Sequence, residues 1–197
     1  MLKHYLSRGD IDPTDIARQL DAMDHTHRLR ELHQLDGPAQ AQLFEAARGA
    51  RPLSLQSMVP ASTPPMREVR HPGRNSLPAF RSFAKVFCSP RPGEAELWGY
   101  NHTGALLSHC VGPGYYVAYE QDDELLIDYT LVPEDKPESW PRILPNHARL
   151  SRFVYHGMVD VLRGVSEHIS VGRAMRAGKM TDNWFVLCRE PRGAHGG

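Results

Sequence analysis

The chain has 197 residues, and its 23 lysines and arginines balance its 23 aspartates and glutamates, so the formal net charge at neutral pH is zero. This length fits one domain, or one domain with an appendage. A balanced charge excludes an electrostatic argument for nucleic acid or an anionic membrane surface as a partner.

The cysteines and the N-terminal residues indicate a cellular location. Cys88, Cys110 and Cys188 form no CxxC pair, which favours reduced thiols in a cytosolic protein over a disulfide framework. The first twenty residues are charged and hold no apolar run, which argues against a secretory signal. No stretch approaches the ~18 apolar residues of a membrane span. The sequence therefore predicts a soluble cytoplasmic protein that does not associate with a membrane.

Residues 1–49 have the pattern of a helical hairpin. Asp12 can cap a helix with Pro13 at its first position, and apolar residues follow at helical spacing. Gly37 and Pro38 separate a second helical stretch, which Gly49 can end. We expect an N-terminal helical segment, and its residues 12–49 are our candidate docking surface for a protein partner.

Residues 50–79 carry six prolines and no regular apolar period. Long stretches without structure are uncommon inside compact domains. We therefore interpret this stretch as a proline-rich strap or linker between two parts of the chain.

From residue 80 onward the pattern changes to strands. The stretches "FAKVF", "AELWGY", 105–111, 115–120 and "ELLIDYTLV" alternate with turn residues, which predicts an antiparallel meander. Asn146 can cap a long helix to about Val165, and "HISVGRAM" with "NWFVLCRE" predicts a final β-hairpin. The expected fold class is α+β: an antiparallel sheet of about six strands, in residues 80–191, packed on one long C-terminal helix, with a frayed tail at 192–197.

The stretch "SHCVGPGYYVAY" raises the question of a reactive cysteine. His109 and Cys110 are neighbours on an expected strand, so their side chains point to opposite faces and do not form a catalytic pair. A small buried cysteine is the simpler interpretation. Gly112-Pro113-Gly114 lacks the remaining residues of a phosphate-binding loop and indicates a turn or bulge.

No motif indicates a metal or a cofactor. His156 and Asp160 have the four-residue spacing of helical metal ligands. On a helix they would continue a charged stripe with several arginines, which is typical of a solvated face. We expect neither a metal site nor a cofactor.

Asp128 lies inside an apolar strand and offers a different candidate. A buried carboxylate needs a partner or shifts its pKa, so Asp128 is either an acid or base in a cavity, a solvated group, or one paired with Lys85 or Arg173. His102 and His109 are the other weak candidates for acid–base catalysis.

Three hypotheses about function remain open. The first is the binding of a small organic ligand in a cavity between a curved sheet and the helix. The aromatic and amide side chains expected to line it are Trp98, Tyr100, Asn101, Tyr115, Tyr119 and Tyr129, with Trp184 as a further aromatic residue. The second is an enzyme that uses Asp128, His102 and His109 as acid–base groups. The third is an interaction module that docks through its N-terminal helices.

Overall fold

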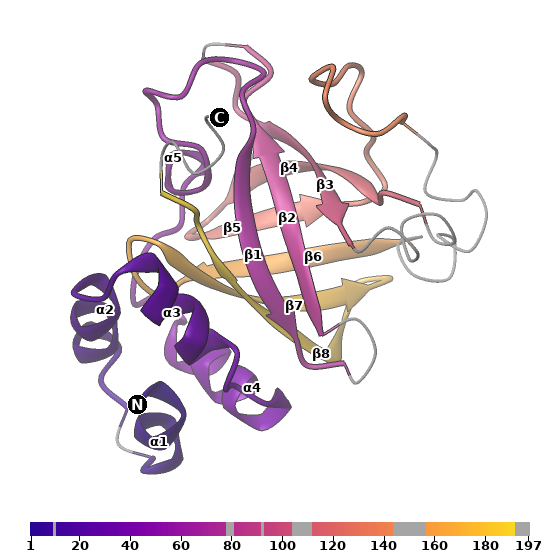
Figure 1. Cartoon of the computed structure of the whole chain (residues 1–197). Helices are drawn as coiled ribbons and strands as arrows, with labels where there is room; N and C mark the ends of the chain where they lie inside the picture. Colours follow the sequence, from indigo (N-terminus) through magenta and orange to yellow (C-terminus); the bar gives the residue numbers. More distant parts are fainter. Residues whose placement is uncertain (10, 78–80, 92, 104–111, 144–156, 192–197) are drawn as a thin grey trace.

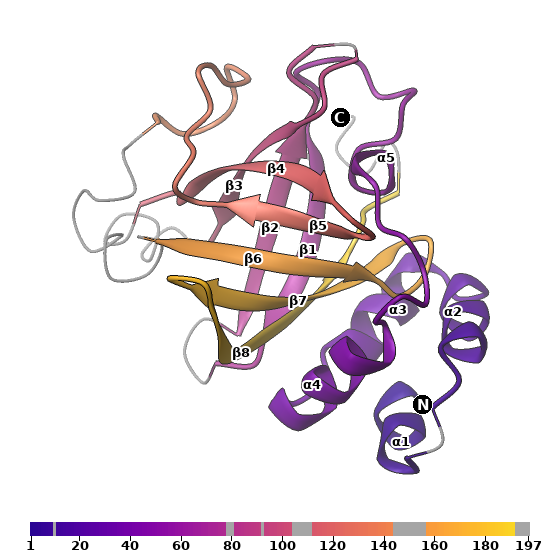
Figure 2. The same cartoon turned by 180° about the vertical axis from the view of Figure 1, so that it is seen from behind.

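A computed structural model describes residues 1–9, 11–77, 81–91, 93–103, 112–143 and 157–191. These residues form a closed barrel of eight antiparallel strands, each paired with its neighbours in chain order. The strands are β1 (Val69–Asn75), β2 (Ser82–Cys88), β3 (Leu97–His102), β4 (Tyr115–Gln121), β5 (Glu124–Asp128), β6 (Met158–Gly164), β7 (Ile169–Arg176) and β8 (Lys179–Cys188). Figures 1 and 2 show the barrel from opposite sides, with the N-terminal helices against its outer surface.

The expected fold class is therefore wrong. The sheet closes on itself instead of packing on a long C-terminal helix, and the described residues contain no such helix. Residues 146–156, the first part of the expected helix, lie outside the described residues. Its last part is β6, which pairs with both β5 and β7.

The prediction of a helix in place of β6 failed for a physical reason. Both faces of this strand are buried, one by the barrel interior and the other by the N-terminal helices. Its polar residues do not mark a wet face, because Asp160 pairs inside the barrel and Arg163 pairs outside it with Glu124 at 2.5 Å. The alternation of apolar and polar residues that identifies a half-buried strand is consequently missing.

The antiparallel pairings expected within the sheet are confirmed where the structure describes them. β2 pairs with β3, β4 with β5, and β7 with β8 in a final hairpin. The expected strand 105–111 lies wholly outside the described residues, and β3 pairs directly with β4. The strand expected over 124–132 ends at Asp128.

The described part of residues 1–49 forms four short helices instead of a two-helix hairpin: α1 (Leu2–Ser7), α2 (Pro13–Asp21), α3 (His25–Leu32) and α4 (Gly37–Ala46). An aspartate caps each of the last three. The carboxylates of Asp12, Asp24 and Asp36 accept hydrogen bonds from backbone amides of the first turn, which satisfies donors that a helix start leaves free. The cap at Asp12 and the proline at the first helical position are as expected.

The apolar sides of these helices are buried on the barrel. Leu20, Leu32 and Leu43 belong to one core with Val171 and Val186 of the outer faces of β7 and β8. Among the described residues no helix is both long and apolar enough to cross a membrane.

Arg163 fastens α4 to the barrel. Its guanidinium donates to the Phe44 carbonyl at 2.9 Å and lies 3.9 Å from the centre of the Phe44 ring. Arg74 of β1 donates to the carbonyl of Leu35 at 3.1 Å. The helices are thus tied to the barrel by polar contacts as well as by apolar burial.

The proline-rich stretch 50–79 contains α5 (Leu55–Met58) and β1. Leu53, Met58 and Val59 pack into the barrel interior at one end, where Figure 1 shows α5. Neutral His71 of β1 donates from Nε2 to the Met58 carbonyl at 3.0 Å. This stretch therefore supplies both a strand of the barrel and the cover for one of its ends.

The seam between the first and last strands is short. β1 and β8 pair only over Gly73–Asn75 and Phe185–Leu187. Pro72 comes next along β1 and has no N–H to donate, so it interrupts the ladder. Beyond it, one backbone hydrogen bond joins the amide of Glu190 to the carbonyl of Arg70, at 2.9 Å.

Candidate functional site

Lys85 lies at the centre of a polar cluster inside the barrel. Its ammonium group donates to Asn101 Oδ1 at 3.1 Å, to the Tyr129 hydroxyl at 2.5 Å and to Asp160 Oδ2 at 2.9 Å. The side chain of Lys85 is 2 % exposed and that of Asp160 is 4 % exposed. The four residues come from β2, β3, β6 and the residue after β5, so the closed barrel is what brings them together.

Aromatic rings surround this ammonium group. Its nitrogen lies 5.1 Å from the ring centre of Tyr116, 5.0 Å from that of Tyr129 and 4.9 Å from that of Phe185. Phe83 is a fourth ring, at 5.9 Å. The faces of aromatic rings attract cations, so the rings and the acceptors stabilise the same charge. We call these side chains with Lys85, Asn101 and Asp160 the lysine box.

Glycines make room for the rings of the box. Gly99 stands directly opposite Tyr116 in the neighbouring strand, and Gly172 stands opposite Phe185. A Cβ atom on either glycine would lie 2.2 Å from the opposing ring. The absence of a side chain lets each ring lie against the backbone of the next strand.

The lysine box is a satisfied structural cluster. An ammonium group has three N–H donors, and here each has an acceptor. Burial lowers the pKa of Lys85, and the charge of Asp160 opposes that shift. The arrangement of three acceptors suits the charged form, and no donor is left over for a ligand.

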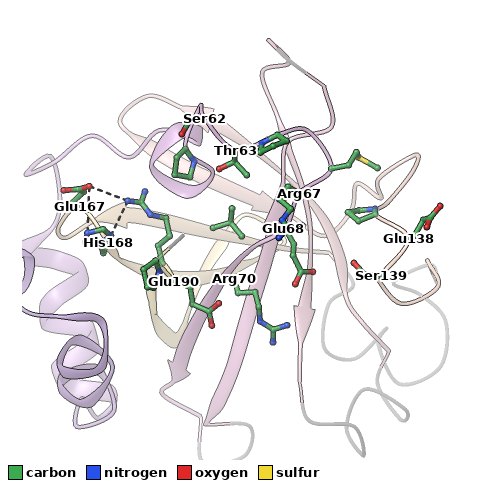
Figure 3. Close-up of a pocket in the computed structure, with 17 residues that line it drawn as sticks. Ser62, Thr63, Arg67, Glu68, Arg70, Glu138, Ser139, Glu167, His168 and Glu190 are labelled. Atoms are coloured by element: carbon green, nitrogen blue, oxygen red, sulfur yellow. Dashed lines mark hydrogen bonds and ion pairs between the residues drawn. The ribbon is translucent and has the colours of Figure 1, made fainter. Parts of the chain in front are cut away.

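A second site lies outside the barrel, next to the β1–β8 seam. It is a partly open pocket of about 1100 Å³, which we call the seam pocket. Four segments contribute to its lining: residues 60–70, residues 189–191, residues 167–168 of the β6–β7 turn, and residues 137–139 of the long connection after β5. Figure 3 shows Glu167 and His168 on one side and Glu138 and Ser139 on the other.

Most charged groups of the seam pocket already have partners. Arg189 donates to the Ser57 carbonyl at 2.5 Å and contacts His168 Nδ1 at 3.3 Å and Glu167 at 3.6 Å. Burial lowers the pKa of His168, and the nearby charges of Arg28 and Arg189 lower it further. These groups hold the β6–β7 turn, α5 and the end of β8 together.

Arg70 differs from these groups. It is half-buried on the outer face of β1, and it forms no side-chain hydrogen bond or ion pair with any residue that the structure describes. The neighbouring Glu68 accepts a hydrogen bond from Trp140 Nε1 at 2.9 Å instead. Arg67, the other arginine of the pocket without a described partner, is exposed.

Trp140 holds one side of the seam pocket in place. Its side chain is buried, and its ring centre lies 4.9 Å from that of Tyr100. With its hydrogen bond to Glu68, this packing attaches the connection after β5 to the outer faces of β2, β3 and β4. Ser139 and Glu138 are thereby positioned at the edge of the pocket.

The residues expected to line one ligand cavity are distributed over three places. Asn101 and Tyr129 belong to the lysine box. Trp98, Tyr100 and Tyr115 lie on the outer face of the barrel under Trp140. Tyr119 and Trp184 pack at the border of the core beneath the N-terminal helices. The structure does not bring the set together around one cavity.

The acid–base candidates are likewise separate. Asp128 Oδ1 accepts from the backbone and hydroxyl of Thr130, at 2.7 and 2.6 Å, as in a local turn. Lys85 and Arg173, its expected partners, instead pair with Asp160 and Asp182. His102 is exposed at the end of β3. His109 and Cys110 lie outside the described residues.

Sequence reasoning missed Asp160 and Arg70 as site residues. The sequence pattern predicts a helix at Asp160, and Arg70 stands in a stretch without a regular pattern. The available signal for the box was Lys85, a charged residue within the apolar run "FAKVF", since a lysine in such a run requires a buried partner. The described residues contain no group of three or more metal-ligating side chains that could hold an ion.

No protein-family model matches the chain, and a search of curated proteins finds no match either. The function therefore has to be inferred from the sites themselves.

Proposed function

We propose that the protein binds a small organic ligand in the seam pocket. The observation that carries this proposal is the pocket itself, about 1100 Å³ in volume and lined by both apolar and charged residues. Ligand sites are concave, largely apolar and furnished with a few polar groups that fix orientation. The seam pocket has this composition, with Pro60, Pro64 and Val69 beside Arg70 and Glu190.

The barrel interior supports this location by contrast. The largest fully buried side chains include Tyr116, Lys85 and Phe87, all of which point into the barrel. A ligand in this part of the interior would have to displace the lysine box, whose donors are already satisfied. The ligand cavity expected between sheet and helix is thus replaced by a pocket on the outside of the barrel.

Native mass spectrometry of the protein purified from its own host tests the proposal. A bound small molecule is expected as a mass adduct on the wild type. Ser139→Trp places an indole at the edge of the pocket, on an exposed residue, and should remove the adduct. Gln42→Trp, at an exposed position on α4, is the matched control and should keep it.

A neutral fluorescent dye such as Nile red provides a second measurement that needs no natural ligand. The wild type and Gln42→Trp should bind the dye equally, and Ser139→Trp should bind it at least several-fold more weakly. Equal binding by all three proteins, together with an adduct that survives Ser139→Trp, would contradict the proposal.

The other two hypotheses stay predictions. The acid–base hypothesis rests on Asp128, His102 and His109. No described contact joins the first two, and His109 lies outside the described residues. The docking hypothesis rests on residues 12–49, whose apolar side is occupied by the barrel in this structure.

A further inference from the structure

We infer that the ligand of the seam pocket carries an oxyanion, a carboxylate or a phosphate, which binds the guanidinium of Arg70. This inference rests on the proposed function and adds the chemical class of the ligand. It starts from the one half-buried arginine of the pocket that has no described partner.

The position of Arg70 is fixed by the barrel. In the β1–β2 register it stands opposite Val86, and Val86 in turn stands opposite Tyr100 of β3. Backbone hydrogen bonding continues on the other side, where the Arg70 carbonyl accepts from the Glu190 amide. The side chain therefore starts from a strand that is hydrogen-bonded on both sides and lines the pocket, and a site on such an element is held more accurately than one on a loop.

The hydrogen-bonding capacity of Arg70 is unused. A guanidinium has five N–H donors in a fixed plane, and a donor that is partly removed from water without a partner costs free energy. Arg189, in the same pocket, has a carbonyl, an imidazole and a carboxylate around it. Within this pocket, Arg70 is thus the half-buried cation that is available to a ligand.

Two carboxylates near Arg70 do not neutralise it. Glu68 accepts from Trp140, and neither Glu68 nor Glu190 forms an ion pair with Arg70. Their charges repel an anion that is merely nearby. Only a group in direct contact with the guanidinium therefore gains enough free energy from hydrogen bonds to bind. Carboxylates and phosphates make such contacts through two parallel hydrogen bonds.

The rest of the pocket indicates that the oxyanion belongs to an organic molecule. Pro60, Pro64 and Val69 offer apolar surface near the arginine, and burial of apolar surface adds affinity that an inorganic ion does not obtain. The expected ligand is an organic acid with an apolar body.

Calorimetric titration with benzoate, benzamide and inorganic phosphate tests this inference. Benzoate and the neutral benzamide have nearly the same shape, so the ratio of their affinities measures recognition of the charge. Benzoate should bind the wild type about ten- to a hundredfold more tightly than benzamide, as hydrogen bonds to charged groups imply. If phosphate displaces benzoate, the site recognises oxyanions in general. If phosphate does not affect the binding of benzoate, the inference is still supported, and the ligand is a carboxylate.

Arg70→Met keeps the apolar stem and removes the charge. It should reduce the affinity for benzoate about tenfold or more and leave benzamide unchanged, while Arg70→Lys should give an intermediate loss. Arg91→Met is the matched control, since Arg91 lies on the exposed β2–β3 turn beside Glu94, and it should change neither affinity. Thermal unfolding of each variant verifies that it folds.

Two results separate the inference from the proposed function. If Nile red binds in the pocket and is lost in Ser139→Trp, but benzoate binds no better than benzamide, the inference fails and the proposed function stands. If neither the dye nor benzoate depends on Ser139 or Arg70, both fail.

Discussion

The lysine box and the seam pocket are opposite solutions to the placement of a cation in the same barrel. In the box, Lys85 is fully enclosed and each of its donors has an acceptor. In the pocket, Arg70 is half-buried beside open volume and has no described partner. The first arrangement specifies a structure, and the second leaves a binding capacity unused.

This difference places the open volume of the described residues outside the barrel, beside a packed interior. The rings opposite Gly99 and Gly172 and the paired charges fill the centre of this one. The pocket lies instead beside the seam, where Pro72 ends the regular pairing of β1 with β8. Changes inside should therefore affect stability, and changes at the pocket should affect binding.

The largest expected effect is at the buried ion pair. Lys85→Met leaves Asp160 without its cation and should lower the free energy of unfolding by about 3–5 kcal/mol. Asp160→Leu should cost a similar amount, since it leaves the ammonium group unpaired. The double variant should lose much less than the sum of the two, because apolar groups of similar volume can replace a buried pair. Urea unfolding of the four proteins measures this coupling, and additive losses would contradict it.

A smaller effect is expected at the glycines that accommodate the rings. Gly172→Ala pushes a methyl group against Phe185 and should lower the free energy of unfolding by about 1–3 kcal/mol. Gly37→Ala is the control, since its new Cβ would have only an ordinary contact, 3.5 Å from the Cβ of Ser76. Chemical denaturation compares the two, and equal losses would mean that the ring does not need the space.

The pH dependence of stability tests the neutral histidine in the strand next to Lys85. Burial lowers the pKa of His71 to about 3, below the ordinary value of about 6.5. Between these values the unfolded chain binds a proton that the folded chain does not, so stability decreases as the pH falls from about 6.5 towards 3. The slope from this one group is at most about 1.4 kcal/mol per pH unit.

His71→Gln removes the titrating group and keeps an N–H for the Met58 carbonyl. It should flatten the decrease in stability below pH 6.5, whereas His4→Gln, at an exposed position on α1, should not. Urea unfolding at several pH values gives the slopes. If the free energy of unfolding of His71→Gln falls with pH as steeply as that of the wild type, other groups cause the acid sensitivity.

The smallest expected effect on stability is at the pocket. Arg70→Met and Ser139→Trp should change the free energy of unfolding by no more than about 0.5 kcal/mol, as is usual for surface substitutions without special contacts. Thermal unfolding measures this change. A loss comparable to that of Gly172→Ala would mean that the pocket residues have a structural role.

The sequence was a good guide wherever turn residues or a helix cap mark the ends of an element. The Asp12 cap of α2 and the strands β2 to β5 were predictable, because turn residues and caps are local signals. It failed at β6, where Asp160 and Arg163 are both buried and paired on opposite faces, so that no periodicity in polarity survives.

The sites were less predictable than the elements. Asn101 and Tyr129 were singled out, but their neighbour Lys85 binds Asp160 across the barrel, a contact between residues 75 positions apart. The seam pocket combines segments around residues 60–70, 137–139, 167–168 and 189–191. Only closure of the ring brings these segments together, and closure is a global property that no local pattern encodes.

The short seam has a consequence for how the molecule comes apart. The partners in the seam are far apart along the chain, so their union carries a high loop-closure entropy. Three residue pairs and one flanking backbone hydrogen bond on each side offset part of it. The ring is thus expected to close last during folding and to open first under thermal stress. A ligand that contacts both β1 and residues 189–191 would bridge this short join, and its binding would stabilise the closed barrel relative to the opened one.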